Sequence, residues 1–406
     1  MLSAPVPARL APTAAADPAP RWGPVLALAG LHAAVTLAWV VYNLYLVELL
    51  VRAGFDAYLA SVLITVEGVL GAVIEPLTGA LSDRVRRTLF RRFFLVLGGV
   101  LLAALLFVAL PLAARGARPG PASLVPALLI GWACAMAVFR APALALLGRY
   151  ARPGALPLAA SVLTSAGALV SAAAPSVRGR LLALGALPTF AAASLALLVG
   201  ALVLRALDRR SPVADAPVDE PGPLDRRDAR AAWLLFAVGT TAALGFRFLL
   251  DGLPRAGASP GATAPAILTA FFLGAAVAGI PLGRLALDRG GRAVTAAGLG
   301  TLAVGAAAAL LLGGGTPVLI WAAVLGAALA ALQNGLFAFS LSAVRLRSGL
   351  GMGLLLGGGG AALGLFNALV AVRRPVPGSS LLAAAALYAL TLVLLLGTRQ
   401  SGPRGA

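Results

Sequence analysis

Three ionisable side chains lie inside apolar segments of the sequence and are candidates for carrying a proton: Glu67, Glu75 and His32. The stretch 57–80 is long enough to span a bilayer and is uncharged apart from Glu67 and Glu75. A carboxyl about 15 Å along such a helix lies near the bilayer midplane, where it costs roughly 3 kcal/mol or more unless it is paired. Glu67 could therefore bind a proton together with a solute and release it on the other side, or it could stay neutral and bond a neighbouring helix.

The other two candidates have structural alternatives as well. Glu75 lies roughly 12 Å further along the same helix and precedes Pro76, which frees the carbonyl of Ala72 and favours a kink. Glu75 is thus expected either to support an inner gate or to couple protons. His32 is either a neutral histidine that bonds a backbone carbonyl or a proton relay.

Polar residues inside other apolar segments are candidates for a solute cavity, and hydrogen bonding between helices is the alternative for the uncharged ones. Arg247 and Asp251 are four residues apart on one helix face, which fits a pair at the membrane interface as well as an anion site. Trp39, Tyr42 and Tyr45 fit an aromatic belt or a ligand platform. The uncharged candidates are Asn43, Thr240, Thr241, Gln333, Asn334 and Asn367.

The composition identifies an integral membrane protein. Hydrophobic residues make up 60% of the 406 residues, charged residues make up 11%, and the mean hydropathy is +0.96. An all-α membrane protein with twelve spans of about 20 residues accounts for this content. The expected spans are 25–47, 57–80, 93–114, 122–144, 156–176, 181–204, 231–250, 264–287, 293–313, 317–341, 350–371 and 379–397.

The arginines predict the orientation. All 32 basic residues are arginine, and 23 of them fall on one side of the spans if the N-terminus is cytoplasmic, against eight on the other side. We therefore expect both termini to be cytoplasmic in a bacterial inner membrane, and we do not expect nucleic-acid binding despite the net charge of +18. The expected organisation is a disordered tail (1–24), a six-helix half (25–204), a cytoplasmic linker (205–230), a second half (231–397) and a tail (398–406).

Two loops repeat half a chain apart. The loop after the second span contains Gly79, Asp83, Arg84 and Arg87, and the loop after the eighth contains Gly283, Asp288, Arg289 and Arg292. Asp83 and Asp288 are 205 residues apart, which indicates a duplicated six-helix unit.

These loops resemble the signature of the major facilitator superfamily, although Arg86 replaces a glycine in the first and an extra residue precedes Asp288 in the second. The resemblance implies two six-helix halves around a central cavity. Physically, the glycines permit close helix approach, and the aspartates can accept from basic groups and helix N-termini across the halves. The alternative is that the basic residues only set topology.

Two segments resemble a narrower group, the plant sucrose transporters and the related glycoside-pentoside-hexuronide cation symporters. They are the segment from Glu75 to Arg84 and the segment from Arg140 to Arg149. Glu75 replaces a glutamine of that group, and Arg149 replaces an aspartate. The small-residue run 349–364 further predicts a span that packs closely or bends.

The sequence contains no phosphate-binding loop, metal-ligand cluster or nucleophile-base pair, and its single cysteine is Cys134. We therefore expect neither an enzyme nor a cofactor. The sequence predicts a monomeric secondary transporter that moves a small polar solute with protons or another cation. The alternatives are a proton-driven exporter, and a receptor or assembly protein that keeps the fold without transporting.

Overall fold

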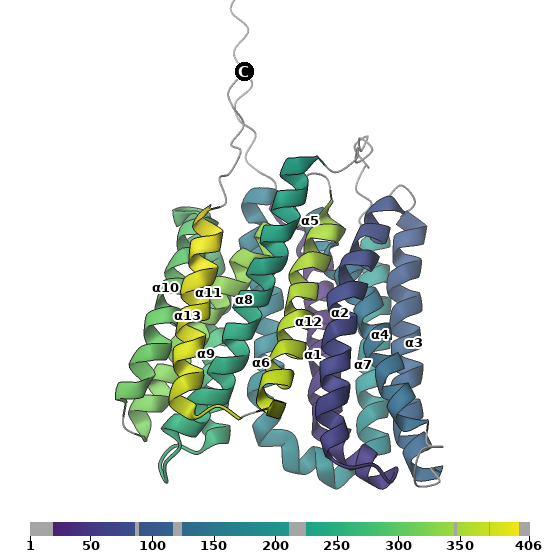
Figure 1. The fold of residues 1–406 in the computed structure, drawn as a ribbon. Helices are drawn as coiled ribbons and strands as arrows, with labels where there is room; N and C mark the ends of the chain where they lie inside the picture. Colours follow the sequence, from purple (N-terminus) through teal and green to yellow (C-terminus); the bar gives the residue numbers. More distant parts are fainter. Residues whose placement is uncertain are drawn as a thin grey trace, which may run out of the picture.

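The computed structural model describes residues 19–85, 89–116, 124–210, 225–312, 314–344, 347–372 and 374–397. In this part of the chain, twelve helical segments are long and apolar enough to cross a membrane (Figure 1). The first six are α1 (Trp22–Arg52), α2 (Tyr58–Arg84), α3 (Leu89–Gly116), α4 (Val125–Leu144), α6 (Leu156–Leu184) and α7 (Ala186–Arg210). The short helix α5 (Leu147–Tyr150) continues α4 in the same span. The second six are α8 (Arg226–Gly257), α9 (Ala264–Arg289), α10 (Gly291–Ala308), α11 (Thr316–Ala343), α12 (Ser348–Val372) and α13 (Pro377–Gly397).

The predicted fold class is confirmed, and each expected span falls mainly on one observed helix, although α6 continues to Leu184 and so includes the first residues of the expected span 181–204. The helices exceed the expected spans mainly at their polar ends; α1, for example, covers 22–52 where 25–47 was expected. Part of the expected linker is also helical, because α7 continues to Arg210 and α8 begins at Arg226. Residues 211–224, most of the first tail (1–18) and the last tail (398–406) lie outside the described residues.

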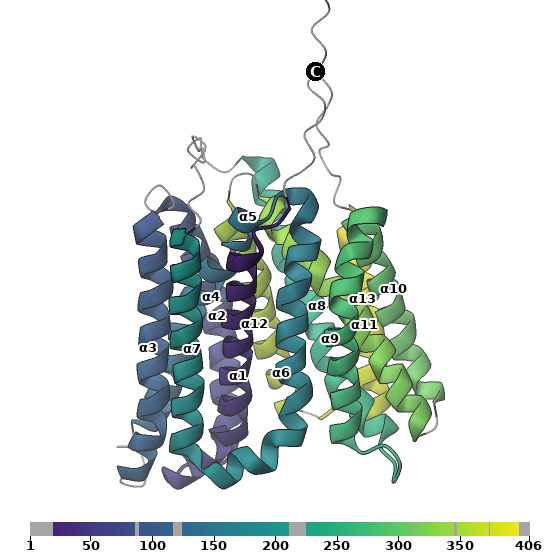
Figure 2. The same ribbon diagram turned by 180° about the vertical axis from the view of Figure 1, so that it is seen from behind.

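The helices form two groups that lie side by side (Figures 1 and 2). Helices α1 to α7 make the first half, and α8 to α13 make the second. The halves contact each other chiefly through α2 against α12 and through α6 against α9. The side of the bundle at which α1 begins and α13 ends is called the termini side here, and the other is called the opposite side.

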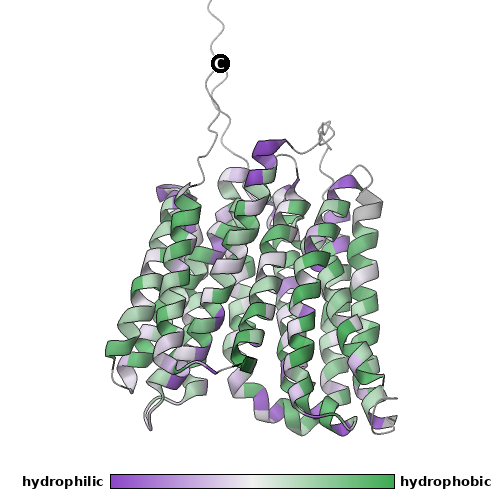
Figure 3. Cartoon of the chain, viewed as in Figure 1, coloured by the Kyte–Doolittle hydropathy of each residue, from purple (hydrophilic) through white to green (hydrophobic). Residues whose placement is uncertain are grey.

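The outer surface of the bundle is apolar along the length of the helices (Figure 3). Large apolar side chains are exposed around it, including Leu105 at 61%, Val277 at 69% and Val304 at 72%. Such a continuous surface would aggregate in water, whereas a bilayer covers it at no cost.

Glycines bring α2 and α12 into backbone contact along much of their length. A methyl group added at Gly79 would lie 2.1 Å from the carbonyl oxygen of Gly349, and one added at Gly353 would lie 2.3 Å from the carbonyl oxygen of Glu75. One added at Gly360 would lie 2.8 Å from the amide nitrogen of Ala72. The expectation that the run 349–364 packs closely is therefore confirmed.

Two adjacent glycines of α12 test this contact. We expect Gly360→Ala to destabilise the protein by about 1–3 kcal/mol, because the added methyl meets backbone that cannot turn away. Gly359→Ala is the matched control, because its methyl would meet only the Cβ of Ala243 at 4.0 Å. Thermal unfolding in detergent measures both variants. Equal melting temperatures would contradict the contact.

Candidate functional site

A central cavity lies between the two halves and has two lobes. The first lobe has a volume of about 690 Å³ and the second about 460 Å³, both within the range of small-molecule sites. The lobes share eight lining residues, drawn from α1, α8 and α11: His32, Thr36, Trp39, Asn43, Phe246, Arg247, Leu329 and Gln333. The cavity is therefore continuous between the halves.

Glu67 lines the second lobe from α2 and is 5% exposed. One of its carboxyl oxygens accepts a hydrogen bond from the hydroxyl of Tyr42 on α1, and the other is buried with no partner among the described residues. The ring of Tyr42 stacks on Trp132 with 4.5 Å between centroids, and Trp132 stacks on Phe107 at 4.6 Å. This aromatic column inside the first half holds the hydroxyl against the carboxyl.

The aromatic belt expected at the end of α1 is therefore wrong for two of its members. Tyr42 and Tyr45 are each 1% exposed and pack inside the first half, and the hydroxyl of Tyr45 donates to the carbonyl of Leu181 at 2.7 Å. Trp39 lines the cavity, so its use as a ligand platform stays a prediction.

Glu75 also lines the second lobe and forms an ion pair with Arg140 of α4. Glu75 is buried at 2% exposure. The arginine count placed Arg140 on the cytoplasmic side, and the structure shows it inside α4, on the cavity wall. Because a lone buried charge is far costlier than a paired one, the contact lowers the cost of burying both side chains.

His32 lines both lobes from α1. Its ring lies at a right angle to the ring of Phe337, with 6.2 Å between the ring centroids. A methyl added at Gly167 of α6 would lie 3.1 Å from Nε2 of His32. The three candidates for proton coupling thus share the wall of one cavity.

Arg247 lines both lobes from α8 and forms no hydrogen bond or ion pair within the described part of the chain. Of the two alternatives for Arg247, the pair with Asp251 is wrong, because Asp251 pairs with Arg255 one turn further along and accepts from the hydroxyl of Ser380 at 2.7 Å. Arg255 also donates to the carbonyl of Pro375 at 3.1 Å. This local cluster satisfies Asp251 at the opposite side and leaves Arg247 facing the cavity.

The uncharged candidates separate into two groups. Asn43 and Gln333 line both lobes. The others do not line either lobe, and their side chains bond to the protein: Thr240 donates to the carbonyl of Phe236, Thr241 to that of Ala237, Asn334 to that of Gly279 and Asn367 to that of Leu363. The hydroxyl of Thr391 also donates to Thr241, from α13 to α8. Asn334 and Thr241 therefore hold helices together, as the alternative predicted.

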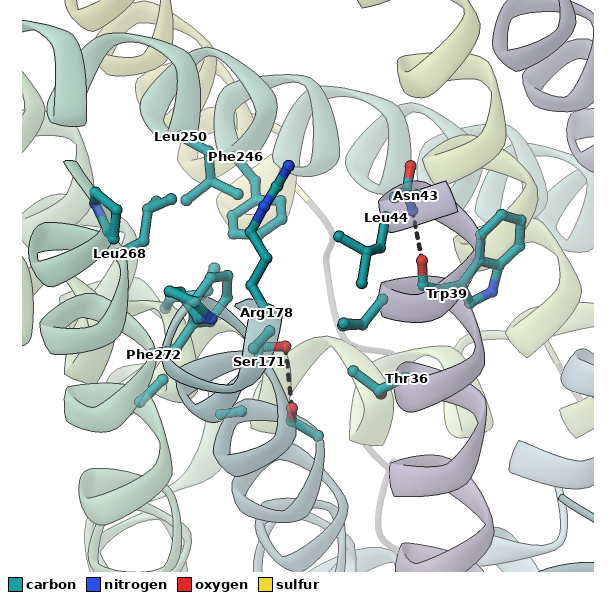
Figure 4. A pocket seen from close by; sticks show the side chains of 18 of the residues that line it. Thr36, Trp39, Asn43, Leu44, Ser171, Arg178, Phe246, Leu250, Leu268 and Phe272 are labelled. Carbon is teal, nitrogen blue, oxygen red and sulfur yellow. Dashed lines mark hydrogen bonds between the residues drawn. The ribbon is translucent and has the colours of Figure 1, made fainter. Parts of the chain in front are cut away.

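The first lobe extends to the helix ends at the opposite side of the bundle, and Figure 4 shows Arg178 and Leu268 among its lining side chains. Its wall includes Arg178 and Leu181 near the end of α6 and Ala264 and Pro265 at the start of α9. Arg178 is exposed, and its guanidinium has no hydrogen bond or ion pair among the residues that the structure describes. The two halves are thus separated there by a solvent-accessible opening.

The halves are in contact at the termini side. The carboxylate of Asp83, at the end of α2, accepts from the backbone N–H groups of Gly349 at 2.9 Å and Leu350 at 2.8 Å. These groups belong to the first turn of α12, which has no partners for them within the helix and favours a negative charge. On the other seam, a methyl added at Gly283 of α9 would lie 2.5 Å from the hydroxyl oxygen of Ser161 on α6.

The second copy of the loop makes different contacts. Asp288 and Arg289 are exposed, and Asp288 has no bond to another described residue. Arg292 donates to the carbonyl of Leu396 at 2.7 Å, so it caps α13 within its own half. In the first copy, Arg84 is exposed, and Arg87 lies outside the described residues. The aspartates of the two copies therefore differ in their contacts, whereas Gly79 and Gly283 both pack closely against a helix of the other half.

The sequence did not predict that Arg140 and Arg178 line the cavity. It also did not predict that Arg140 pairs with Glu75 or that the hydroxyl of Tyr42 bonds to Glu67. Arg178 was counted only as a topology signal, Arg140 was counted as one and also began the segment of the narrower resemblance, and Tyr42 was considered only as part of the aromatic group. The expected span 122–144 already placed Arg140 inside a helix, but its partner is 65 residues away and leaves no local signal.

No protein-family model matches the chain, nor does any curated protein. Solved structures do match. The human organic anion transporter MFSD10 (TETRAN) is 18% identical with a TM-score of 0.64, covering 93% of this chain and 100% of that one. A bacterial homologue of the iron transporter ferroportin in an outward-facing state is 15% identical with a TM-score of 0.66, covering 92% and 98%.

The Major Facilitator Superfamily transporter FucP, in the outward conformation, is 14% identical with a TM-score of 0.64, covering 93% of this chain and 99% of that one. At these identities the likeness concerns the fold. The chain has the major facilitator fold.

The contact of Asp83 with α12 predicts the effect of Asp83→Asn. We expect the arrangement that is closed at the termini side to lose about 1–2 kcal/mol of stability. The population of conformations that open this side should then rise by a factor of about 5–30. The measurement is the rate at which a hydrophilic maleimide labels Ser161→Cys, which is buried beside Gly283, in a Cys134→Ser background. Folded yield is expected to change little.

Asp288→Asn is the matched control, because Asp288 occupies the equivalent place in the second loop and is exposed. Its labelling rate should equal that of the parent. Equal rates for Asp83→Asn and Asp288→Asn would contradict a closing role for Asp83.

Proposed function

We propose that the chain is a secondary transporter that moves a small polar solute across the cytoplasmic membrane by alternating access, with a proton bound at Glu67. The observation that carries the proposal is the central cavity, which opens at the opposite side and ends at inter-half contacts on the termini side. A rocking motion of one half against the other would exchange these two arrangements.

The seams between the halves suggest how the motion occurs. Asp83 holds α2 on α12 through backbone N–H groups, a contact that can be released without disturbing either core. On the other seam, Gly283 and Ser161 meet near the termini side, whereas Arg178 and Pro265 line the opening. Closing the opening and releasing Asp83 would present the cavity to the termini side.

Glu67 is the residue that we propose for proton coupling. Three observations support it: Glu67 lies on the cavity wall, one of its oxygens accepts a hydrogen bond from Tyr42, and the other has no partner among the described residues and could carry the proton. Glu75 is less suited, because its ion pair with Arg140 opposes protonation. His32 is the remaining alternative on the same wall.

We also propose the orientation and the state of assembly. The distribution of arginines supports a cytoplasmic termini side, and the cavity lies within one chain, which supports a monomer as the transporting unit. The two segments that resemble the sucrose and glycoside-pentoside-hexuronide group meet through Glu75 and Arg140. That contact supports a common role for the two segments but not a sugar substrate.

The proposal predicts that Glu67→Gln retains solute exchange but loses accumulation driven by a pH gradient. Glutamine keeps the shape and an oxygen that can accept from Tyr42, but it cannot release a proton. The measurement compares counterflow with gradient-driven uptake in proteoliposomes. Glu48→Gln, a change at a glutamate paired with Arg52 outside the cavity, is the control and should keep both activities.

Accumulation by Glu67→Gln with the parent's pH dependence would exclude Glu67 as the coupling residue and move the assignment to Glu75 or His32. If both the parent and Glu67→Gln bind solutes but exchange none across the membrane, the chain would instead be a receptor.

A further inference from the structure

The cavity carries more positive than negative charge. Arg140 is neutralised by Glu75, whereas Arg247 and Arg178 have no ion-pair partner within the described ranges. The remaining carboxyl on the wall is Glu67, which bonds to Tyr42 rather than to an arginine. With Glu67 ionised, these side chains leave one net positive charge, and with Glu67 protonated they leave two.

The structure explains why Arg247 has no partner in the protein. Asp251, the acid nearest to it along α8, is held by Arg255 and Ser380. Arg140 lines the second lobe together with Arg247, and it carries the same charge, so it cannot serve as the partner of Arg247. Its half-buried guanidinium therefore faces the cavity with N–H donors that can bind an anion from outside the chain.

The walls around the arginines are mainly apolar and partly aromatic. Phe246 and Arg247 are neighbours on α8 and line both lobes, and Trp39 lines both lobes from α1. Figure 4 shows Leu250, Leu268 and Phe272 around the first lobe, with Arg178 extending from α6. This arrangement suits a ligand with an apolar body and a charged end.

We infer that the solute is a small organic anion with one carboxylate or sulfonate on an apolar body, and that Arg247 binds the anionic group. A guanidinium offers paired N–H donors that match two oxygens of such a group. Arg178, at the opening, attracts the anion as it enters. The inference deepens the proposed transport function and rests on it.

Binding of an anion would also explain why Glu67 takes up a proton. The titratable and charged groups that share the second lobe with Glu67 are His32, Glu75, Arg140 and Arg247, and those beside it outside the lobe are Tyr42 and Cys134. Protonating Glu67 removes the negative charge that an entering anion would meet. A proton and a monoanion that cross together carry no net charge, so the membrane potential would not drive or oppose the step.

Three probes with one apolar body test the inference: 3-phenylpropionate, its neutral amide and the cationic 3-phenylpropylamine. Binding to the purified full chain is measured by calorimetry in detergent, and counterflow is measured in proteoliposomes against protein-free vesicles. We expect the carboxylate to bind at least about tenfold more tightly than either analogue, as a charge-assisted bond to Arg247 requires. 3-Phenylpropanesulfonate then shows whether a sulfonate is equally accepted.

The variants locate the site. Arg247→Gln should weaken carboxylate binding about 10- to 100-fold, and Arg247→Lys should weaken it less, because lysine keeps the charge but not the paired donors. Arg178→Gln should slow association and reduce its dependence on salt. Arg180→Gln, an exposed arginine on the same helix outside the cavity lining, is the control and should match the parent.

Failure of the carboxylate to bind, preference for the amide or amine, or parent-like binding by Arg247→Gln would each overturn the inference. If Arg247→Gln does not fold, the probe series on the parent and the Arg178→Gln variant still decide it. Counterflow of the amide or amine without the carboxylate would overturn the anion inference and leave the transport proposal standing. Tight carboxylate binding without counterflow of any probe would overturn transport and leave the anion site.

Discussion

A charged side chain inside a bilayer needs a partner or access to water, and this constraint organises the polar groups of the molecule. Glu75 has Arg140, and Asp83 has the first turn of α12. Glu67 has the hydroxyl of Tyr42, which an aromatic column holds in place. Arg247 has no ion-pair partner within the described residues and instead faces the open cavity. The central cavity is therefore where the protein has left charge uncompensated.

The two seams between the halves differ, and the difference gives the structure a direction. Between α2 and α12, glycines on both helices, among them Gly79 on α2 and Gly353 and Gly360 on α12, bring the backbones together along much of their length. On α6 and α9, the close contact at Gly283 is near the termini side, while the opposite ends of these helices line the opening. The closely packed α2–α12 seam suits a pivot, and the α6–α9 seam suits the gate that moves.

The sequence predicted the fold well because bilayer thickness imposes a length that apolar runs must meet, so twelve helices could be placed within a few residues. The cavity was predicted in part. Glu67 and Gln333 stood out as polar groups inside spans, but nothing local tells that Asn334, the next residue, turns away to Gly279. The partner of Arg140 comes from another helix, and Arg247 lost its expected partner to Arg255. Such choices between competing partners are decided by packing, which sequence spacing does not contain.

Alternating access is the central claim, and spin-label distances across the α6–α9 seam test it most directly. In a Cys134→Ser background, Leu184→Cys with Thr263→Cys reports the opposite side, and Gly154→Cys with Leu287→Cys reports the termini side. The account predicts that a change of pH or the addition of a solute shifts the two distance distributions in opposite directions, one pair approaching as the other separates. Distances that stay fixed, or that lengthen together, would contradict it.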